Sequence, residues 1–349
     1  MPPFEGRLAD GWVWGRGALD MKGGVAMMLA ALLRARAEGL ELPGDVLLCV
    51  TADEEAGSFH GARYLVESHP ELFAGVRRAV SEAGFPAYFG GRRIHLVQVA
   101  EKQVCWLRAT VRGPGGHGAV VVRGGAMARL GRALALLERA RLPVHVTPAA
   151  RLMLEALARA APLPAGPALR ALLRPPLTGP ALRLLGRNGS RLEPLLRHTV
   201  SATAVRGGGE MLNVVPSEVE IGLDGRLLPG FAPDDLIREL RPLLGPGVEL
   251  ELAFHDPGPT AVDMTGFPLL ETILREADPG AAVVPFLLPG VTDARFFARL
   301  GIQTYGFLPL PLPADFDFVP TIHGADERVP AEALELGACC LHELLRRFR

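Results

Sequence analysis

The hydrophobic pattern of the first part of the chain predicts strands that alternate with helices. A short mixed strand is expected at residues 11–19, and apolar residues recur at helical spacing over residues 21–38. Residues 45–52 (DVLLCVTA) are almost continuously apolar, which is typical of a strand covered on both faces. Residues 59–68 predict a helix, and residues 77–81 predict another buried strand. This β-α-β-α-β order predicts an α/β fold with a mainly parallel sheet flanked by helices.

The pattern changes near residue 100. Residues 103–112 alternate apolar and polar positions, as expected of a strand with one exposed face. The elements expected next are a helix, two strands, a helix and a strand, at residues 123–141, 198–206, 214–227, 233–244 and 248–254. This β-α-β-β-α-β order indicates a small α+β domain inserted into the first domain. Within it, residues 143–197 are rich in leucine, alanine, arginine and proline, and they predict short helices interrupted by prolines.

The βα pattern returns after the inserted segment. The expected elements are a helix, a strand, a helix, a strand and a last helix, beginning near residues 267, 281, 292, 302 and 330. A chain of 349 residues is long enough to bury two cores. We therefore expect an α/β domain made of residues 1–98 and 257–349, interrupted by an inserted domain at residues 99–256.

The composition argues against several classes of partner. Lysine and arginine number 37 and aspartate and glutamate number 38, so no net charge directs the chain to nucleic acid or to an anionic membrane. No apolar run is long enough to span a bilayer. Cys49, Cys105, Cys339 and Cys340 lack C-x-x-C spacing, so neither a zinc knot nor a disulfide framework is indicated. This cysteine usage fits a reducing compartment, and we expect a cytoplasmic protein.

Acidic residues and a histidine follow the predicted strands of the α/β domain, where an open sheet places its ligand site. They are Asp20, Glu54, Glu55, Glu82 and His323. Carboxylates and an imidazole that converge at one rim would suit zinc, cobalt or manganese. Taken singly, Asp20 could be a helix N-cap, and Glu82 or His323 could be surface residues or hydrogen-bonded structural residues. Glu54 and Glu55 are harder to explain as structure because adjacent acids repel each other, and in extended backbone they would point to opposite faces.

Seven segments resemble, in the same order along the chain, the motifs of a dinuclear metallopeptidase and amidohydrolase family. The family includes aminoacylase, acetylornithine deacetylase, succinyl-diaminopimelate desuccinylase, glutamate carboxypeptidase and carboxypeptidase S. The segments are GRGALDMKGG, TADEEAGS, SEAG, GGHGA, LNVVPSEVEIGLDGRLLPG, GVTDARFF and HGADERV. The resemblance covers the whole chain. It implies a zinc-exopeptidase-like catalytic domain with the inserted domain as a lid and dimerisation domain.

For the metal centre, the resemblance implies two zinc ions, with cobalt or manganese as alternatives. Asp20 would bridge the two ions, and Glu55 and His323 would complete one site. Glu82 would serve the other site. A cis peptide bond is implied between Asp20 and Met21.

For catalysis, the resemblance implies that Glu54 is the general base and that His117 stabilises the oxyanion. Asn213 and Arg226 match substrate-contacting positions of the inserted domain, and Arg295 matches a residue near the substrate carboxylate. Two metal ions would activate a shared water and polarise the scissile carbonyl. Without the resemblance, His117 would be interpreted as a turn residue in the glycine-rich stretch GPGGHGA.

The length of the segment between His117 and Asn213, together with LPGVTDARFF and HGADER, most resembles carboxypeptidase S and the secreted N-acyl-amino-acid hydrolases. The expected substrate is therefore a peptide or an N-acyl amino acid with a free carboxylate. A homodimer is also expected, because a histidine at the His117 motif often completes the neighbouring subunit's site in this family. The one-sided pattern of residues 103–112 would supply an edge for this pairing.

The sequence departs from the family at its beginning. The family's first motif, His-x-Asp, has no counterpart, since residues 1–6 (MPPFEG) resemble a stretch that follows it. The histidine of that motif would bind the ion that Glu82 serves, and its aspartate would orient Glu54. We therefore expect an N-terminally truncated chain that exposes apolar residues near positions 46–50 and 79–80. The alternative is a catalytically inactive fragment or binding protein that retains the fold. A nucleotide or redox enzyme is disfavoured, because the sequence has no strand–GxGxxG–helix unit.

Overall fold

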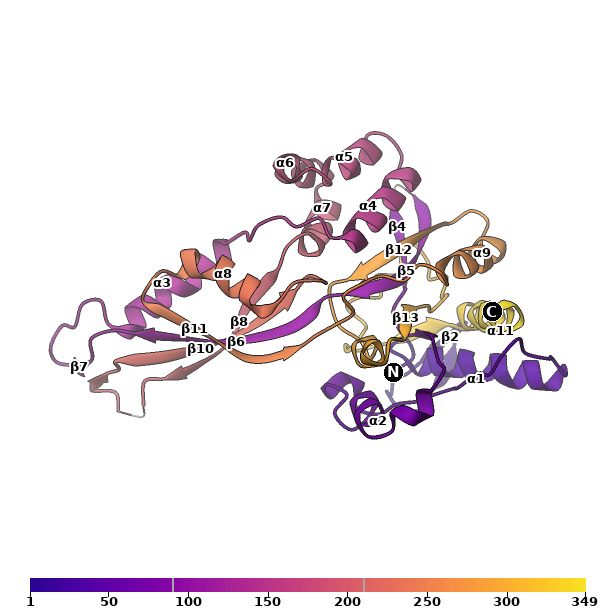
Figure 1. Cartoon of the computed structure of the whole chain (residues 1–349), viewed down its shortest axis with the longest axis horizontal. Helices are drawn as coiled ribbons and strands as arrows, with labels where there is room; N and C mark the ends of the chain where they lie inside the picture. Colours follow the sequence, from indigo (N-terminus) through magenta and orange to yellow (C-terminus); the bar gives the residue numbers. More distant parts are fainter. Residues whose placement is uncertain (90, 210) are drawn as a thin grey trace.

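A five-stranded sheet forms the centre of the α/β domain in the computed structural model, which describes residues 1–89, 91–209 and 211–349 (Figure 1). Its strands are β3 (Arg78–Ser81), β4 (Pro86–Phe89), β5 (Arg92–Glu101), β12 (Ala282–Leu288) and β13 (Gln303–Gly306). Their order is β12-β5-β13-β3, and β4 also pairs with β5. β12–β5 and β13–β3 are parallel, whereas β5 meets β13 and β4 in antiparallel contacts. The predicted α/β fold is confirmed, with these antiparallel contacts added to the parallel pairs.

Helices cover this sheet on both faces. The helices of the α/β domain are α1 (Lys22–Ala37), α2 (Ala62–Ser68), α9 (Phe267–Ala277), α10 (Ala294–Phe297) and α11 (Ala331–Arg347). Met27 of α1 and Leu341 of α11 share a buried cluster with Val97 and Val99 of β5. On α2, Val66 packs against Phe296 of α10 in a smaller cluster. In the part of the chain that the structure describes, no helix is both long and apolar enough to cross a bilayer.

Residues 45–52 are not the buried strand that their apolar pattern predicts. Residues 45–50 have no regular secondary structure, and no described strand pairs with them. Val46, Leu47 and Val50 are 40%, 54% and 63% exposed. A strand buried on both faces needs paired neighbours and cover, and the described residues supply neither. The exposure expected near residues 46–50 is therefore observed, whereas residues 79–80 are half-buried.

The inserted domain contains a separate four-stranded antiparallel sheet with the order β11-β6-β10-β8 (Figure 1). Its elements are β6 (Gln103–Arg112), α3 (Ala126–Arg139), β8 (Thr199–Gly207), β10 (Glu218–Leu227), α8 (Pro233–Leu244) and β11 (Val248–Asp256). The predicted β-α-β-β-α-β order is confirmed. Leu130 of α3 and Leu240 of α8 belong to the core that covers one face of this sheet.

Strand β6 is central rather than an edge, so the expectation that residues 103–112 would pair with another molecule is wrong. The edges are β8 and β11. Alternation along β6 reflects the open face of the sheet, where Trp106 is 46% exposed beside buried Cys105 and Leu107. Alternating apolar and polar residues indicate that one face of the sheet is exposed, but they do not distinguish an edge strand from a central strand.

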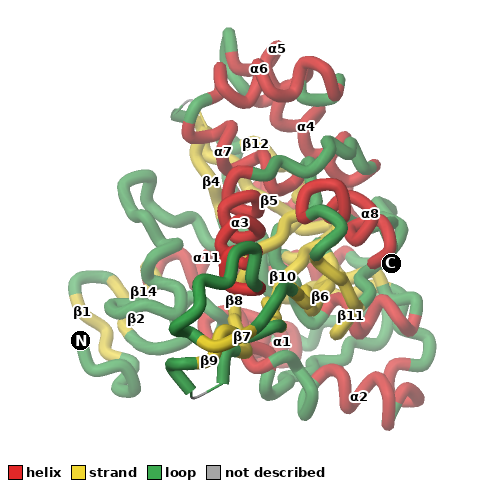
Figure 2. The backbone as a smooth tube through the Cα atoms, turned by 90° about the vertical axis from the view of Figure 1, so that its left-hand side faces the viewer, coloured by secondary structure: helices red, strands yellow, loops and turns green. Residues whose placement is uncertain are grey.

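The predicted proline-interrupted helices between residues 143 and 197 are present, but they do not cover the inserted sheet. They are α4 (Pro148–Ala160), α5 (Ala165–Ala171), α6 (Pro175–Leu185) and α7 (Arg187–Leu192). Met153 and Leu154 of α4 share a core with Ile94 of β5 and Val284 of β12. Figures 1 and 2 show these helices above the five-stranded sheet. The insertion therefore completes the core of the α/β domain.

The chain passes between the two sheets at Lys102 and leaves the inserted sheet after Asp256. The first crossing lies slightly later than the expected boundary at residue 98, because β5 continues to Glu101 in the five-stranded sheet. The second crossing coincides with the expected boundary. The division into two domains remains our interpretation of these sheets.

A buried carboxylate fixes the loop that precedes α1. Glu327 is 4% exposed and lies beside β14 (Arg328–Pro330), which pairs with β2 (Trp12–Trp14). Its oxygens accept hydrogen bonds from the N–H groups of Gly17, Leu19 and Asp20, at 2.9, 2.9 and 3.1 Å. Arg16 Nη1 lies 2.6 Å from the same carboxylate. Glu327 therefore sets the path of the chain up to Asp20.

We expect Glu327→Gln to lower the free energy of unfolding by about 2–3 kcal/mol, because hydrogen bonds to a buried charge are lost and an amide N–H₂ would face backbone N–H donors. Urea unfolding followed by circular dichroism measures the difference. The matched control is Glu335→Gln, an exposed acid on α11, which should change stability by less than about 0.5 kcal/mol. Equal unfolding midpoints for the two variants would contradict the role given to Glu327.

Candidate metal centre and active site

Three of the predicted ligands converge, although they lie far apart in the sequence. One ligand atom each of Asp20, Glu55 and His323 lies within 4.8 Å of the other two. His323 Nε2 is 2.8 Å from Glu55 Oε1 and 3.4 Å from Asp20 Oδ2. The peptide bond between Asp20 and Met21 is cis, as the resemblance implied. His323 also borders an open cavity of about 520 Å³.

The charges of this cluster fit a divalent cation. Burial, followed by the nearby charge of Glu55, raises the pKa of Asp20. The hydrogen bond between the His323 imidazole and the Glu55 carboxylate raises the pKa of His323, and the ring lies between two carboxylates. A divalent ion could bind between these groups when Nε2 carries no proton. Two carboxylates and an imidazole form a usual donor set for zinc.

Glu54 and Glu82 lie beside this cluster but do not belong to it. Glu54 and Glu55 begin the 3₁₀ turn η1 (Glu54–Ala56), so they are not in the extended backbone that was expected. Burial and then the charge of Asp293 raise the pKa of Glu54. Burial, and then the charges of Glu54 and Asp20, raise the pKa of Glu82. We expected all four predicted ligands to converge; three of them do, and Glu82 is a half-buried acid nearby.

Two acidic residues that the sequence analysis did not select support the site. Asp293 is 5% exposed, and its Oδ2 accepts a hydrogen bond from Thr51 at 2.8 Å. Glu101 is fully buried and accepts hydrogen bonds from the N–H and the hydroxyl of Thr292. Asp293 belongs to the GVTDARFF segment, which carried the only available signal, whereas Glu101 lies in no selected segment.

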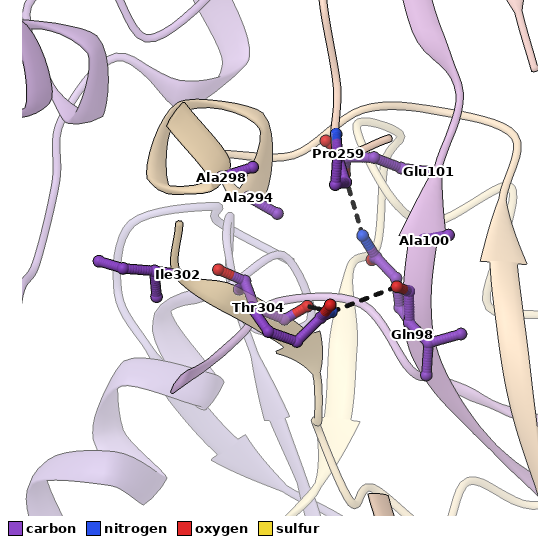
Figure 3. Close-up of a pocket in the computed structure, with 10 residues that line it drawn as sticks. Gln98, Ala100, Glu101, Pro259, Ala294, Ala298, Ile302 and Thr304 are labelled. Carbon is purple, nitrogen blue, oxygen red and sulfur yellow. Dashed lines mark hydrogen bonds between the residues drawn. The ribbon is translucent and has the colours of Figure 1, made fainter. Parts of the chain in front are cut away.

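A small cavity lies beside Glu101. Figure 3 shows Gln98, Glu101 and Ala294 among the residues that line it, with the hydrogen bond from Gln98 to Glu101 drawn. Its volume is about 10 Å³, which is close to the space that one water molecule needs. The cavity is therefore too small to be a substrate site.

Arg295 is buried, and its guanidinium makes its contacts with other residues of the chain. It is 4% exposed, its Nε donates to Asp256 Oδ2 at 2.9 Å, and its guanidinium stacks on Phe296 at 4.4 Å. Nη2 lies 3.4 Å from the carbonyl oxygen of Gly57 and from Ser58 Oγ. A contact between Arg295 and a substrate carboxylate stays a prediction, and these internal contacts do not favour it.

The predicted residues of the inserted domain lie away from the cluster. His117, on β7 (Gly116–His117), pairs with Val214 of β9 (Val214–Val215), and the N–H of Gly118 donates to Asn213 O at 2.7 Å. Figure 1 places β7 at the end of the molecule opposite α1, the helix that follows Asp20. His117 and Asn213 are therefore neighbours that do not reach Asp20 in their own chain.

Arg226, on the inserted sheet, also has a partner within its own strand. Its Nε and Nη2 donate to the two carboxylate oxygens of Asp224, at 2.9 and 3.1 Å. Arg226 is half-buried. Its contact with a substrate stays a prediction.

A second group of potential ligands, His145, His198 and Glu239, is a poor metal site. His145 Nε2 is 2.6 Å from Glu239 Oε1, and His198 Nε2 is 3.8 Å from the same oxygen. However, the N–H of Leu228 donates to His198 Nδ1 at 3.1 Å. A neutral imidazole that accepts at Nδ1 carries its proton on Nε2, so that nitrogen has no lone pair for an ion. The group is better described as a hydrogen-bonded link between α8 and the ends of the helical insertion.

Comparison with known proteins supports the resemblance. The model of peptidase family M20/M25/M40 matches residues 1–347. Probable carboxypeptidase S-like 2 of Dictyostelium discoideum is 25% identical over 351 aligned positions, which cover 94% of this chain and 64% of that protein. Human N-fatty-acyl-amino acid synthase/hydrolase PM20D1 is 25% identical over 365 positions, covering 99% of this chain and 70% of that protein. The chain thus spans slightly less than two thirds of the first of these relatives.

A solved structure supports the fold. The M20 family metallo-carboxypeptidase Sso-CP2 from Sulfolobus solfataricus superposes with a TM-score of 0.64 at 16% identity, covering 99% of this chain and 79% of that chain. The family expected from the seven motifs is confirmed. The chain belongs to peptidase family M20/M25/M40, a family of metal-dependent hydrolases that act on amide bonds.

Proposed function

We propose that this chain is the catalytic part of a zinc-dependent hydrolase that cleaves the amide bond of a peptide or an N-acyl amino acid with a free carboxylate. The observation that carries the proposal is the convergence of Asp20, Glu55 and His323 beside Glu54. The similarity to a probable carboxypeptidase S-like protein and to an N-fatty-acyl-amino acid hydrolase supports this substrate class.

The residues of the cluster divide into ion ligands and a proton carrier. Asp20, Glu55 and His323 would hold one zinc ion, and Asp20 with Glu82 would contribute to a second. Bound zinc would supply Lewis acidity toward the scissile carbonyl and would lower the pKa of water. Glu54 would accept the proton of the attacking water and return it to the leaving amine. Its place in η1, directly before Glu55, keeps this carboxylate next to the ligands.

His117 would act in the active site of a second subunit. It is exposed at the end of β7, beside Asn213, and its own chain gives it no path to Asp20. In a homodimer, this end of the inserted domain could bring His117 toward the partner's cluster, where its imidazole would donate to the oxyanion. Asn213 and Arg226 are proposed as substrate contacts from the same domain.

A catalytically inactive binding protein is the second candidate. Among the described residues, Glu82 belongs to no group of three ligand atoms, so only Asp20 and Glu82 would hold the second ion. A protein with one occupied site could still bind acyl amino acids through the same surface. Hydrolysis assays decide between the two candidates.

Glu54→Gln should lower kcat on N-acyl amino acids and dipeptides by about 10²–10⁴, because the proton acceptor is lost while the ligands remain. Zinc content, measured by elemental analysis, should not change. Glu71→Gln, at an exposed acid outside the cluster, is the control and should keep full activity. Near-normal turnover by the Glu54 variant would remove Glu54 from the mechanism.

His323→Gln should instead lower the zinc content, because one of the three ligands of the cluster is lost. The comparison is His69→Gln, at an exposed histidine that contacts Glu71 and Tyr64 rather than the cluster. Both proteins are equilibrated with zinc, desalted and measured by inductively coupled plasma mass spectrometry. Equal zinc in the two variants would show that His323 is not a ligand.

A further inference from the structure

The two chain crossings between the sheets end in buried charged residues. The first crossing runs from Glu101, the last residue of β5, through Lys102 into β6, and the second leaves β11 at Asp256. Glu101 and Lys102 are fully buried, and Asp256 is 5% exposed. Charged side chains are rarely buried to this extent unless they are bound by partners. The partners of these residues therefore indicate what the crossings hold in place.

Both crossings bind the same short stretch, residues 292–295. Glu101 Oε2 accepts hydrogen bonds from the N–H and the hydroxyl of Thr292, at 3.0 and 2.7 Å. Asp256 Oδ2 accepts a hydrogen bond from Arg295 Nε at 2.9 Å. Arg295 Nη1 donates to the carbonyl of Thr292 at 2.7 Å, so the two crossings meet at the beginning of α10. Figure 3 shows Glu101 and Ala294 lining the small cavity at this meeting point.

From this point Arg295 contacts the turn that carries Glu54, here called the glutamate turn (residues 53–60). Arg295 Nη2 lies 3.4 Å from the carbonyl oxygen of Gly57 and 3.4 Å from the hydroxyl of Ser58, a fully buried residue. The segment before the turn, residues 45–50, pairs with no described strand. The Arg295 contacts are therefore among the polar links that attach the glutamate turn to the body of the protein.

We propose that Asp256 is a positioning residue for the glutamate turn. Its carboxylate orients the Arg295 guanidinium through a buried charge-assisted hydrogen bond, and the oriented guanidinium holds Gly57 and Ser58. The position of Glu54 then depends on the crossing that leaves the inserted domain. The effect on turnover rests on the proposed function, whereas the link between Asp256 and the turn does not.

A second arm of Asp256 provides an internal control. Asp256 Oδ1 accepts a hydrogen bond from Arg299 Nη2 at 2.5 Å, and Arg299 Nη1 lies 3.0 Å from Glu67 Oε1 on α2. This arm attaches α2 rather than the glutamate turn. Removing Arg299 disturbs the same carboxylate but leaves its bond to Arg295.

The test is hydrogen exchange of the zinc-loaded protein, followed by mass spectrometry, in Asp256→Asn. The amides of Ala56, Gly57, Ser58 and His60 are hydrogen-bonded to Asp53 or Glu54, so their exchange reports the order of the turn. We expect them to exchange about tenfold faster in the variant. We also expect kcat to fall by about 10–100-fold with little change in KM, because a displaced base affects the reaction rather than binding.

Two matched variants separate positioning from general destabilisation. Asp278→Asn removes an aspartate that binds Arg93 and His95 near the start of β5, far along the strand from the crossing. Asp278→Asn and Arg299→Gln should leave both the exchange of the turn and kcat unchanged. If Asp256→Asn does not fold, Asp256→Glu is used instead. This variant keeps the negative charge on a side chain that is one methylene longer, and it should increase the exchange of the turn to a smaller extent.

Equal exchange of the turn in the Asp256 and Asp278 variants would overturn the proposal, whether both stay slow or both become fast. If the unsubstituted chain hydrolyses no amide, the proposed function fails, but the exchange comparison still decides whether Asp256 holds the turn. Faster exchange with unchanged kcat in an active protein would overturn the catalytic part alone.

Discussion

The carboxylate of Glu327 is the constraint on which the candidate metal centre depends. It accepts hydrogen bonds from the backbone N–H groups of Gly17, Leu19 and Asp20, and it lies only a few residues after His323 in the same segment. Asp20 and His323 are separated by almost the whole chain, so their meeting requires a contact of this kind. A charged acceptor is suited to this task, because it binds several backbone donors at once in a buried place. Nothing in the apolar pattern of the sequence points to such a contact.

The cluster that results is electrostatically unfavourable without a cation. Burial, and then the charges of neighbouring acids, raise the pKa values of Asp20, Glu54 and Glu82. The imidazole of His323 lies against Glu55 and Asp20, and its hydrogen bond to Glu55 raises its pKa. An arrangement that gathers carboxylates in a partly buried place and supplies one imidazole is best explained by binding of a divalent ion. This argument needs only the residues themselves, and the family membership agrees with it.

The sequence predicted most elements correctly, and its failures have physical causes. Apolar periodicity located α1, β3, β12 and the elements of the inserted domain. It missed β5 because His95, Gln98 and Glu101 interrupt the apolar run, although all three are buried and hydrogen-bonded. The strand predicted at residues 45–52 was wrong, because an apolar pattern shows that a segment could be buried but does not show whether another strand lies beside it.

The candidate site was predicted from strand ends and from motifs together. Asp20, Glu55 and His323 were selected because they follow predicted strands, and the resemblance to family motifs assigned their roles as ligands; the structure brings the three together. The supporting residues Glu327, Asp293 and Asp256 were not selected, since a buried acid that binds a backbone N–H, a hydroxyl or an arginine resembles a surface acid in the sequence. The sequence also did not predict which sheet the helices of residues 148–192 pack against. Their position in the chain suggests the inserted domain, and their apolar faces would fit either core, but they pack on the α/β domain.

Anomalous scattering at the zinc absorption edge, from crystals grown with zinc, tests the central claim most directly. The account predicts a strong peak bounded by the side chains of Asp20, Glu55 and His323, with the proton of His323 Nε2 replaced by the ion. A peak at His145, His198 and Glu239 in its place, or no peak at Asp20 in crystals that contain zinc elsewhere, would contradict the assignment of the metal centre.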